Sequence, residues 1–327
     1  MQPGDKVFVA GHRGLVGSAI VRRLHRLGFR NLVIRTRPQL DLCDGIATRA
    51  FFEAEQPDYV FFAAAKVGGI LANDTSPADF IRENLAIQLS VLEAAHMAKV
   101  TKLLFIGSSC IYPKFAPQPI REESLLSGAL EPTNEAYAIA KIAGILMCRS
   151  YNRQHGTRFM SVMPTNLYGE GDTFDRVRSH VVPALMRRFH DAKVEGLPEV
   201  VVWGTGTPRR EFLHVDDMAD ASIHLMRVWA ETGADGSIVG GPNAINEIVN
   251  VGYGDDIGIG DVARMIREIV GYSGNLMFDP SKPDGTPSKL LDSSRLRETG
   301  WRPSVSLHEG ITRTYAWYLE HLTDARR

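Results

Sequence analysis

The architecture of this chain follows from the segment Lys6-Val7-Phe8-Val9-Ala10-Gly11-His12-Arg13-Gly14-Leu15-Val16-Gly17. Residues 6–10 predict a buried strand, and residues 14–27 predict an amphipathic helix closed by Gly28. Glycines between such a strand and helix permit a tight turn, close approach of a pyrophosphate and close helix packing. A glycine triplet is also compatible with a merely flexible loop. Its place between the first strand and the first helix favours a dinucleotide site.

Apolar strands and helices alternate through the first half of the chain. Continuous apolar runs indicate strands covered on both faces, and repeated strand–helix units give parallel sheets with right-handed crossovers. The further predicted strands are 31–35, 58–64, 102–107 and 159–163, with a short segment near 39–41, and the helices include 46–55, 80–99 and one through Tyr137. We therefore predict an α/β fold with a Rossmann-type doubly wound parallel sheet.

From about Tyr168 the pattern becomes irregular, with many Gly and Pro residues. We expect a Rossmann domain formed by residues 1–169 and a returning segment at about 211–258. Residues 170–210 and 259–327 are expected to form a smaller mixed α/β lobe that binds substrate. A chain of 327 residues is long enough for this division.

Composition and charge narrow the classes of function. Hydrophobic residues make up 44% and charged residues 23%, as in ordinary globular proteins. The 37 basic and 38 acidic residues give a net charge of −1, so no overall field favours nucleic acid or an anionic membrane. No apolar stretch is long enough to span a bilayer. An anionic small molecule must therefore be held by local arginines and backbone amides.

The cysteines indicate a reducing compartment. Cys43, Cys110 and Cys148 are odd in number and widely spaced, which suits free thiols rather than a disulfide framework. Residues 1–6 lead into the first strand without a signal-peptide pattern. We expect a cytoplasmic protein without a metal site.

Arginines indicate which dinucleotide is bound. NAD sites usually carry an acidic residue at the end of the second strand, but this strand ends Ile34-Arg35-Thr36-Arg37. Arg13 adds a cation inside the glycine loop. Guanidinium groups suit a 2′-phosphate, so we expect NADP(H). Arg35 and Arg37 are also compatible with a solvated strand end, and only one of them need join Arg13 at the ligand.

Tyr137 and Lys141 stand four residues apart on a predicted helix, so their side chains share one face. An ammonium beside a phenol lowers the pKa of the tyrosine, which suits proton transfer during reduction of a carbonyl. The strand at 102–107 leads into Ser108 and Ser109, at the edge where such sheets bind ligands. A Ser-Ser pair alone is more often the cap of a strand end. Together with the other motifs, it leads us to expect that Ser108 donates a hydrogen bond to a substrate carbonyl beside Tyr137.

The chain resembles the extended short-chain dehydrogenase/reductase family of nucleotide-sugar epimerases, dehydratases and reductases over nearly its whole length. The resemblance rests on GHRGLVGSAI at 11–20, AAAKVGGI at 63–70, GSSCIYPK at 107–114, PTNLYG at 164–169, SHVVPAL at 179–185, RREFLHVDD at 209–217 and KPDGTP at 282–287. It implies conversion of GDP-4-keto-6-deoxy-D-mannose to GDP-L-fucose, by epimerisation at C3 and C5 followed by NADPH-dependent reduction at C4.

The resemblance also implies roles for individual residues. Inverting C3 or C5 beside a ketone needs a base on one face and an acid on the other; the family implies Cys110 as base and His180 as acid. Taken singly, these two residues are compatible with core packing and helix capping. The implied cofactor contacts are Gly11, His12, Arg13, Gly14, Leu15, Val16, Gly17, Arg37, Asp41, Leu42, Lys141, Pro164, Asn166, Leu167 and His180.

Four residues of the second lobe are the expected substrate contacts. Arg188 and Arg210 would bind the diphosphate, Trp203 would pack on the sugar or nucleoside, and Asp279 would accept from a guanine or a hydroxyl. These assignments rest mainly on resemblance, because surface arginines often contribute little and tryptophans are often core residues.

Two positions depart from the family pattern, and other functions stay open. Ala136 stands where relatives often have proline, and Ser288 where they often have a basic residue; Lys289 beside it offers a substitute phosphate contact. The alternatives are a related GDP-keto-sugar enzyme such as one making GDP-L-colitose, an epimerase without reduction, or a non-catalytic NADP-binding regulator. The resemblance further implies a homodimer through residues 80–99 and 136–153.

Overall fold

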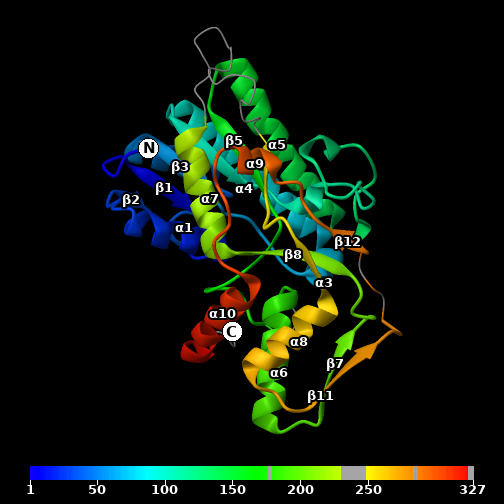
Figure 1. Cartoon of the computed structure of the whole chain (residues 1–327). Helices are drawn as coiled ribbons and strands as arrows, with labels where there is room; N and C mark the ends of the chain where they lie inside the picture. Colours follow the sequence, from blue (N-terminus) through cyan, green and yellow to red (C-terminus); the bar gives the residue numbers. More distant parts are fainter. Residues whose placement is uncertain (176–178, 230–247, 283, 285, 323–327) are drawn as a thin grey trace.

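The protein, seen as a computed structural model, is described at residues 1–175, 179–229, 248–282, 284 and 286–322. Its centre is a six-stranded sheet in the order β2-β1-β3-β4-β5-β9, with every neighbouring pair parallel (Figure 1). The strands are β1 (Val7–Ala10), β2 (Leu32–Val33), β3 (Tyr59–Phe62), β4 (Lys102–Ile106), β5 (Phe159–Pro164) and β9 (Ile248–Val251). The strand order reverses between β1 and β3, as a doubly wound sheet requires, so the predicted Rossmann-type fold is confirmed.

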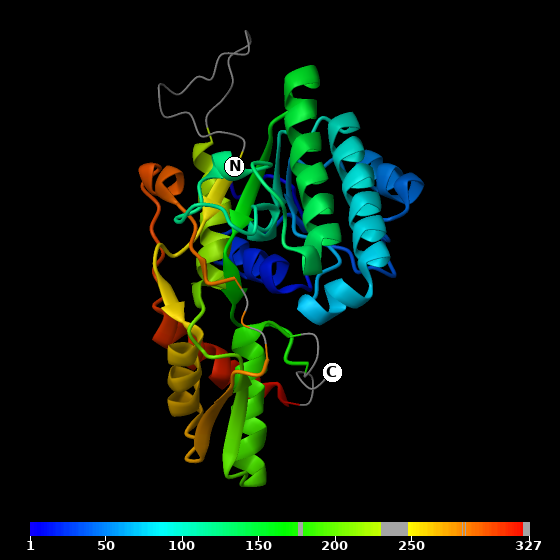
Figure 2. The ribbon, with the colours of Figure 1, turned by 90° about the vertical axis from the view of Figure 1, so that its right-hand side faces the viewer.

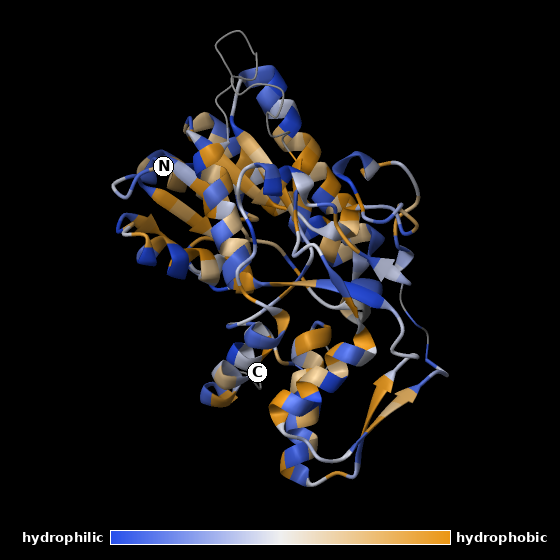
Figure 3. Ribbon diagram, in the orientation of Figure 1, coloured by the Kyte–Doolittle hydropathy of each residue, from blue (hydrophilic) through white to orange (hydrophobic). Residues whose placement is uncertain are grey.

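Helices cover both faces of this sheet. On one face, α2 (Gly45–Glu55), α4 (Pro77–Met97) and α5 (Glu135–His155) pack against the strands in one buried cluster. On the other face, α1 (Leu15–Arg26) and α7 (Val215–Val228) form a second cluster with the same strands. Figure 3 shows hydrophobic residues along the central strands, as expected for a sheet buried on both sides.

The second strand is shorter than the predicted range 31–35. Only Leu32 and Val33 pair with β1, and they form the edge of the sheet. Ile34 is 38% exposed, and the Arg35 guanidinium pairs with the carboxylate of Glu55 at the end of α2. An edge strand has one hydrogen-bonding neighbour, so the chain leaves the ladder where these side chains turn outward.

A smaller lobe lies below the large sheet in Figure 2. It contains α6 (Val181–Glu195), α8 (Ile259–Val270) and α10 (Leu307–Glu320), which share a third buried cluster with the pair β7 (Glu199–Trp203) and β11 (Asn275–Asp279). Between the lobes runs another sheet, of β6 (Asn166–Tyr168), β8 (Arg209–His214), β10 (Asp256–Gly258) and β12 (Ser288–Lys289). The short helices are α3 (Ile70–Thr75), α9 (Ser294–Glu298) and the 3-10 turns Ser109–Ile111, Glu122–Ser124 and Pro132–Asn134.

We propose the two-lobe division expected from the sequence, with one qualification at the C-terminal side. Leu296 and Trp301 belong by sequence to the substrate lobe, yet both are buried in the cluster beneath α1 and α7. Parts of the proposed ranges, at 176–178, 230–247, 283, 285 and 323–327, lie outside the described residues. Within the described residues, no helix is long and apolar enough to cross a membrane.

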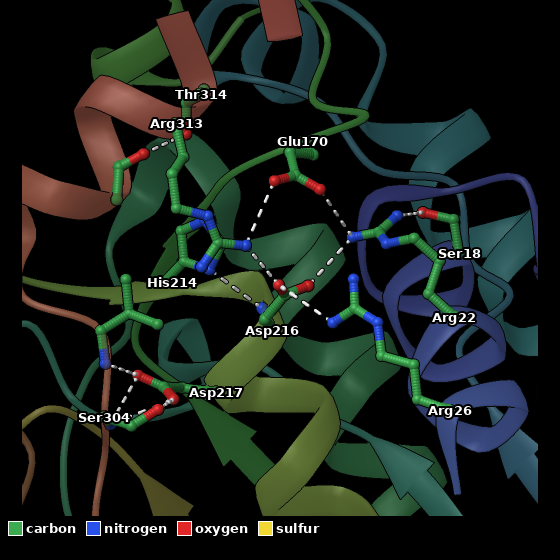
Figure 4. Close-up of polar contacts among 12 residues, drawn as sticks. Ser18, Arg22, Arg26, Glu170, His214, Asp216, Asp217, Ser304, Arg313 and Thr314 are labelled. Atoms are coloured by element: carbon green, nitrogen blue, oxygen red, sulfur yellow. Dashed lines mark hydrogen bonds and ion pairs between the residues drawn. The ribbon is translucent and has the colours of Figure 1, made fainter. Parts of the chain in front are cut away.

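An ion network joins α1, α7, α10 and the loop after β6. The Asp216 carboxylate accepts from Arg22 at 3.1 Å and Arg313 at 2.6 Å, and it lies 4.0 Å from Arg26. Glu170 lies 3.2 Å from Arg313 and 3.8 Å from Arg22 (Figure 4). Burial raises the pKa of Asp216, but the hydrogen bonds from Arg313 and Arg22 outweigh it and bring the pKa below its ordinary value.

Replacing this carboxylate should destabilise the protein. We expect Asp216→Asn to lower the free energy of unfolding at pH 7 by about 1 to 3 kcal/mol, because arginines lose their charged partner. The native pKa is depressed, so this stabilisation is present above about pH 4 and is lost as the pH falls through the native pKa. Denaturant unfolding at pH 7 and pH 3 tests both points. Asp261→Asn, which removes the exposed pair with Arg264, should change stability by under about 0.5 kcal/mol.

Candidate active site

The glycine loop is shaped by two contacts that leave no room for a side chain. A Cβ on Gly17 would lie 2.1 Å from the Gly11 carbonyl oxygen, and one on Gly11, at φ +85°, would lie 2.7 Å from the Ala64 amide nitrogen. Gly14 stands at the N-cap of α1 without a side-chain cap. The loop therefore brings bare backbone to the amino end of a helix, where the helix dipole favours negative charge.

Other groups at this loop fit a dinucleotide phosphate. The first turn of α1 contains no acidic residue. The His12 Nδ1 atom is buried and has no hydrogen-bond partner among the described residues, while burial and the nearby Arg13 lower the pKa of His12. A neutral imidazole with an unused nitrogen beside bare amides is suited to a ligand rather than to the core.

The two strand-end arginines differ in their surroundings. Arg35 pairs with Glu55 and lies 5.4 Å from the Phe51 ring centre, so it is held by protein. The side chain of Arg37 is 67% exposed and lies 3.4 Å from Asp41 and 3.6 Å from Glu83. Arg13 is exposed at the glycine loop. Arg13 and Arg37 are therefore more accessible than Arg35, and their contact with a 2′-phosphate stays a prediction.

Most of the remaining expected cofactor contacts follow β2 or β5 along the chain. Asp41 accepts from the Cys43 amide at 3.0 Å, a bond that lowers the pKa of Asp41, and the Leu42 carbonyl accepts from Ser90. Pro164 ends β5, and Asn166 and Leu167 follow in β6. The side-chain amide of Asn166 donates to the backbone carbonyl of Glu211 at 2.8 Å, which fixes the start of β6.

Ser108, Tyr137 and Cys110 meet where β4 ends. Ser108 caps the 3-10 turn at Ser109–Ile111, with its hydroxyl accepting from the Cys110 amide at 3.2 Å. Tyr137 enters from the first turn of α5 and is hydrogen-bonded with the Ser108 side chain. The carboxyl end of a central strand and the amino end of a helix thus bring the two hydroxyl groups together, as a carbonyl-binding pair requires.

The protonation of the tyrosine–lysine pair differs from the sequence expectation. Burial raises the pKa of Tyr137, the nearby Cys110 raises it further, and the Ser108 hydrogen bond only partly opposes them. Burial also lowers the pKa of Lys141 to about 7. The Lys141 Nζ atom donates to the Ile106 carbonyl at 2.7 Å and lies 5.8 Å from the Tyr137 ring centre. The prediction that Lys141 lowers the tyrosine pKa is therefore wrong for this structure, because desolvation of both groups dominates.

The Cys110 sulfur has two donors that sequence reasoning did not assign to it. Asn134 Nδ2 lies 3.4 Å from the sulfur, and Lys289 Nζ lies 4.0 Å from it. Asn134 precedes α5 and carries no sequence signal of its own. The sequence suggests Lys289 only as a phosphate contact. Its distance of 179 residues from Cys110 along the chain gives no local pattern that could have revealed the pair.

His180 belongs to the smaller lobe, where it directly precedes α6. It is the N-cap residue of α6 and is exposed at its surface, although desolvation by the surrounding protein lowers its pKa. Within the described residues, no hydrogen bond joins His180 to Ser108, Cys110 or Tyr137. The described residues also contain no group of three His, Cys, Asp or Glu side chains that could hold a metal ion.

Three of the four expected substrate contacts lie in the smaller lobe, and the fourth, Arg210, lies in the sheet between the lobes. Trp203 and Asp279 are register partners at the ends of β7 and β11, and Trp203 is 68% exposed. Arg188 donates to the Val201 carbonyl at 2.8 Å, two residues before Trp203. Arg210 lies on β8 and donates to the Thr286 carbonyl at 2.6 Å. Burial lowers the pKa of both arginines without making either neutral at physiological pH.

A cavity of about 350 Å³ adjoins Arg188. It lies between α6 and β7 and is lined by Arg187, Arg188, Asp191, Leu197 and Val201 among others. Apolar walls with a few charged groups are typical of sites for small molecules.

The parallel sheet, the glycine loop and the Ser–Tyr–Lys cluster define a nucleotide-dependent epimerase or reductase of the short-chain class. The NAD dependent epimerase/dehydratase family matches residues 7–252, and the chain belongs to this family. "Probable GDP-L-fucose synthase 1" of Oryza sativa subsp. japonica is 58% identical over 99% of the chain and 95% of its own length. "GDP-L-fucose synthase" of Escherichia coli K12 is 56% identical over 97% of both chains.

A solved structure resembles the chain as a whole. It is the GDP-mannoheptose C4 reductase of Campylobacter jejuni with NADP bound, with a TM-score of 0.86 and 40% identity over 98% of this chain and 99% of the other.

The glycine loop gives a direct test of the cofactor site. We expect Gly17→Ala to weaken NADPH binding by about tenfold or more, because the added carbon pushes the Gly11 carbonyl out of the loop. Fluorescence titration measures the binding, and circular dichroism checks that the variant is folded. Gly4→Ala is the matched control, since a Cβ there meets nothing within 4 Å. Equal affinity of the Gly17 variant and the native protein would contradict this site.

Proposed function

We propose that this protein is a bifunctional epimerase-reductase that converts GDP-4-keto-6-deoxy-D-mannose to GDP-L-fucose with NADPH. One observation carries the proposal: Ser108, Tyr137, Lys141 and Cys110 converge at the carboxyl end of β4. This place therefore contains two hydroxyl groups that can donate hydrogen bonds to a substrate carbonyl. It also contains a thiol that can remove a proton from a neighbouring carbon. The GDP-L-fucose synthases of rice and Escherichia coli, at 58% and 56% identity, support this activity over its relatives.

The cofactor proposed is NADP(H), which supplies the hydride for C4 when it is bound. Gly11 to Gly17 would hold the pyrophosphate, and Arg13 with Arg37 would hold the 2′-phosphate. Asp41, Leu42, Pro164, Asn166, Leu167 and His180 are the further contacts implied by the family. The bare backbone at the amino end of α1 and the unpartnered His12 nitrogen support this assignment.

Epimerisation comes first in the proposed mechanism. The Cys110 thiolate takes the proton from C3 or C5, and the electron pair moves to the C4 oxygen as an enolate. The Ser108 and Tyr137 hydroxyls donate to that oxygen and stabilise its charge. His180, as the acid, returns a proton on the opposite face and so inverts the centre. The lowered pKa of His180 favours its neutral form, so it must acquire a proton before each donation.

Reduction follows at C4. Tyr137 gives its proton to the new alkoxide as the ketone becomes an alcohol. Because burial and Cys110 raise the pKa of this phenol, Tyr137 is protonated at neutral pH and ready to donate. Lys141, fixed on the Ile106 carbonyl, would contact the ribose hydroxyls of the cofactor.

The proposed substrate contacts lie in the smaller lobe and on β8 of the sheet between the lobes. Arg188 and Arg210 would bind the diphosphate, Trp203 would cover the sugar or the nucleoside, and Asp279 would accept a hydrogen bond from the ligand. Trp203 and Asp279 share one register pair, which supports a common role.

A homodimer and a cytoplasmic location complete the proposal. The face of α4 and α5 exposes Leu89, Met97, Ile139 and Leu146, and apolar exposure along two adjacent helices suits a twofold four-helix interface. None of Cys43, Cys110 and Cys148 forms a disulfide among the described residues, in keeping with a reducing compartment.

The overall proposal is tested by product analysis. Purified protein, GDP-4-keto-6-deoxy-D-mannose and NADPH are mixed, nicotinamide absorbance is followed, and the sugar is identified by NMR. We expect NADPH oxidation with GDP-L-fucose as product. Absence of oxidation together with measured NADPH binding would reject this substrate and favour the alternative, a 3-deoxy keto-sugar leading to GDP-L-colitose.

Two variants should separate the half-reactions. We expect Tyr137→Phe to lower the rate of reduction by about 100- to 10,000-fold, because the alkoxide loses its proton donor. Cys110→Ser should impair epimerisation first, and so change the sugar product before it stops NADPH oxidation. The matched controls are Tyr151→Phe, on the same helix, and Cys43→Ser. An unchanged product distribution in the Cys110 variant would refute its role as base.

A further inference from the structure

The ammonium group of Lys289 lies beside the Cys110 sulfur, although the two residues are 179 positions apart in the sequence. We propose that Lys289 is a positioning residue that holds the Cys110 side chain as a thiolate through the approach of its ammonium group. This inference rests on the proposed function, in which Cys110 is the base. Lys289 itself touches neither the sugar nor the cofactor in this role. It acts through the sulfur, from which its Nζ atom is 4.0 Å away.

The backbone around Lys289 is fixed to both halves of the molecule. Lys289 pairs with Arg210 in the β12–β8 register, and the neighbouring Ser288 hydroxyl donates to Asp256 at 3.0 Å. On the other side, the Ile120 amide donates to the Leu290 carbonyl at 2.7 Å, and the Leu290 amide donates to Gln118 at 2.8 Å. These contacts fix the backbone of Lys289 relative to β8 and to residues 118–120, which follow Cys110 in the chain.

Among the described residues, the Cys110 side chain interacts with Asn134, Tyr137, Lys141 and Lys289. Asn134 donates from the turn before α5 but carries no charge. Tyr137 is neutral, because burial raises its pKa. Lys141 is buried, its pKa is lowered to about 7, and its Nζ atom donates to the Ile106 carbonyl. Lys289 is half-buried and its Nζ atom lies 4.0 Å from the sulfur, so its ammonium group is placed to stabilise a thiolate.

The ammonium of Lys289 also lacks a competing anion. Within the described residues, no ion pair joins Lys289 to a carboxylate, whereas Lys6, Lys66 and Lys114 each have one. The alternative role for Lys289 is to bind the substrate diphosphate beside Arg210, its register partner. The 4.0 Å contact favours the sulfur, and the two roles predict different measurements.

The step that Lys289 assists is the transfer of a proton from carbon to the Cys110 sulfur. The thiolate takes the proton of C3 or C5 and becomes a thiol, while the carbon–hydrogen electron pair becomes the enolate at C4. The thiol then returns its proton to solvent and restores the thiolate beside the Lys289 ammonium. Lys289 keeps its own protons throughout.

The first measurement is the alkylation of Cys110 by iodoacetamide as a function of pH, followed on the Cys110 peptide by mass spectrometry. It uses the full-length protein without substrate. We expect Lys289→Met to move the pH of half-maximal alkylation upward by about one pH unit, because an opposite charge at this distance favours the ionised form to that extent. Lys289→Arg should stay near the native value.

Lys6→Met is the matched control for loss of a lysine. Lys6 lies just before β1, at the edge of the sheet opposite the Cys110 end of β4, and it pairs with Glu55. Alkylation of Cys110 should follow the native profile in this variant. An identical profile in the Lys289→Met variant and the native protein would overturn the proposal.

The second measurement separates this inference from the proposed function. Incorporation of deuterium from D₂O at C3 and C5 of the keto-sugar should fall about tenfold in Lys289→Met at neutral pH, with KM unchanged. A shifted alkylation profile without loss of deuterium exchange supports the Lys289–Cys110 pair and rejects Cys110 as the base. A raised KM with a native alkylation profile overturns the proposal and assigns Lys289 to the diphosphate.

Discussion

A buried carboxyl group, that of Glu211, connects the parts of the molecule on which the site depends. Its side chain is fully buried and accepts from the Gly254 amide at 2.7 Å and the Leu291 amide at 3.1 Å. A Cβ on Gly252 would lie 2.3 Å from the Glu211 carboxylate oxygen, so this position of the turn requires glycine. Burial raises the pKa of Glu211, and amide donors rather than a cation satisfy it. One side chain on β8 thus fixes the turn after β9 and the strand that carries Lys289.

Local patterns were sufficient to predict the large sheet. Helices cover both faces of β1, β3, β4 and β5. Their sequences are therefore continuous apolar runs, which predict buried strands directly. Gly11 and Gly17 were predictable for a related reason, since only glycine permits the close contact of α1 with the loop. The edge strand β2 is shorter than the predicted range, because an edge has one pairing neighbour and Ile34, just beyond the strand, is exposed.

The contacts of the site were less accessible to sequence reasoning. The Tyr137–Lys141 spacing gives a shared helix face, but it does not report burial, and burial reverses the expected effect on the tyrosine. Asn134 and Lys289 reach Cys110 from a turn and from a two-residue strand, neither of which has a pattern of its own. Long-range pairings depend on the whole fold, so the residues around a catalytic side chain are the last to be predicted.

The buried Lys141 has a further consequence for calorimetry. With a pKa of about 7, its amine is only partly protonated in the free protein at physiological pH. Any ligand whose oxygens accept hydrogen bonds from the ammonium form stabilises that form and draws a proton from the buffer. The heat of ligand binding will then include the ionisation enthalpy of whichever buffer is used. Titrations in phosphate and in Tris should therefore report different enthalpies for one and the same binding event.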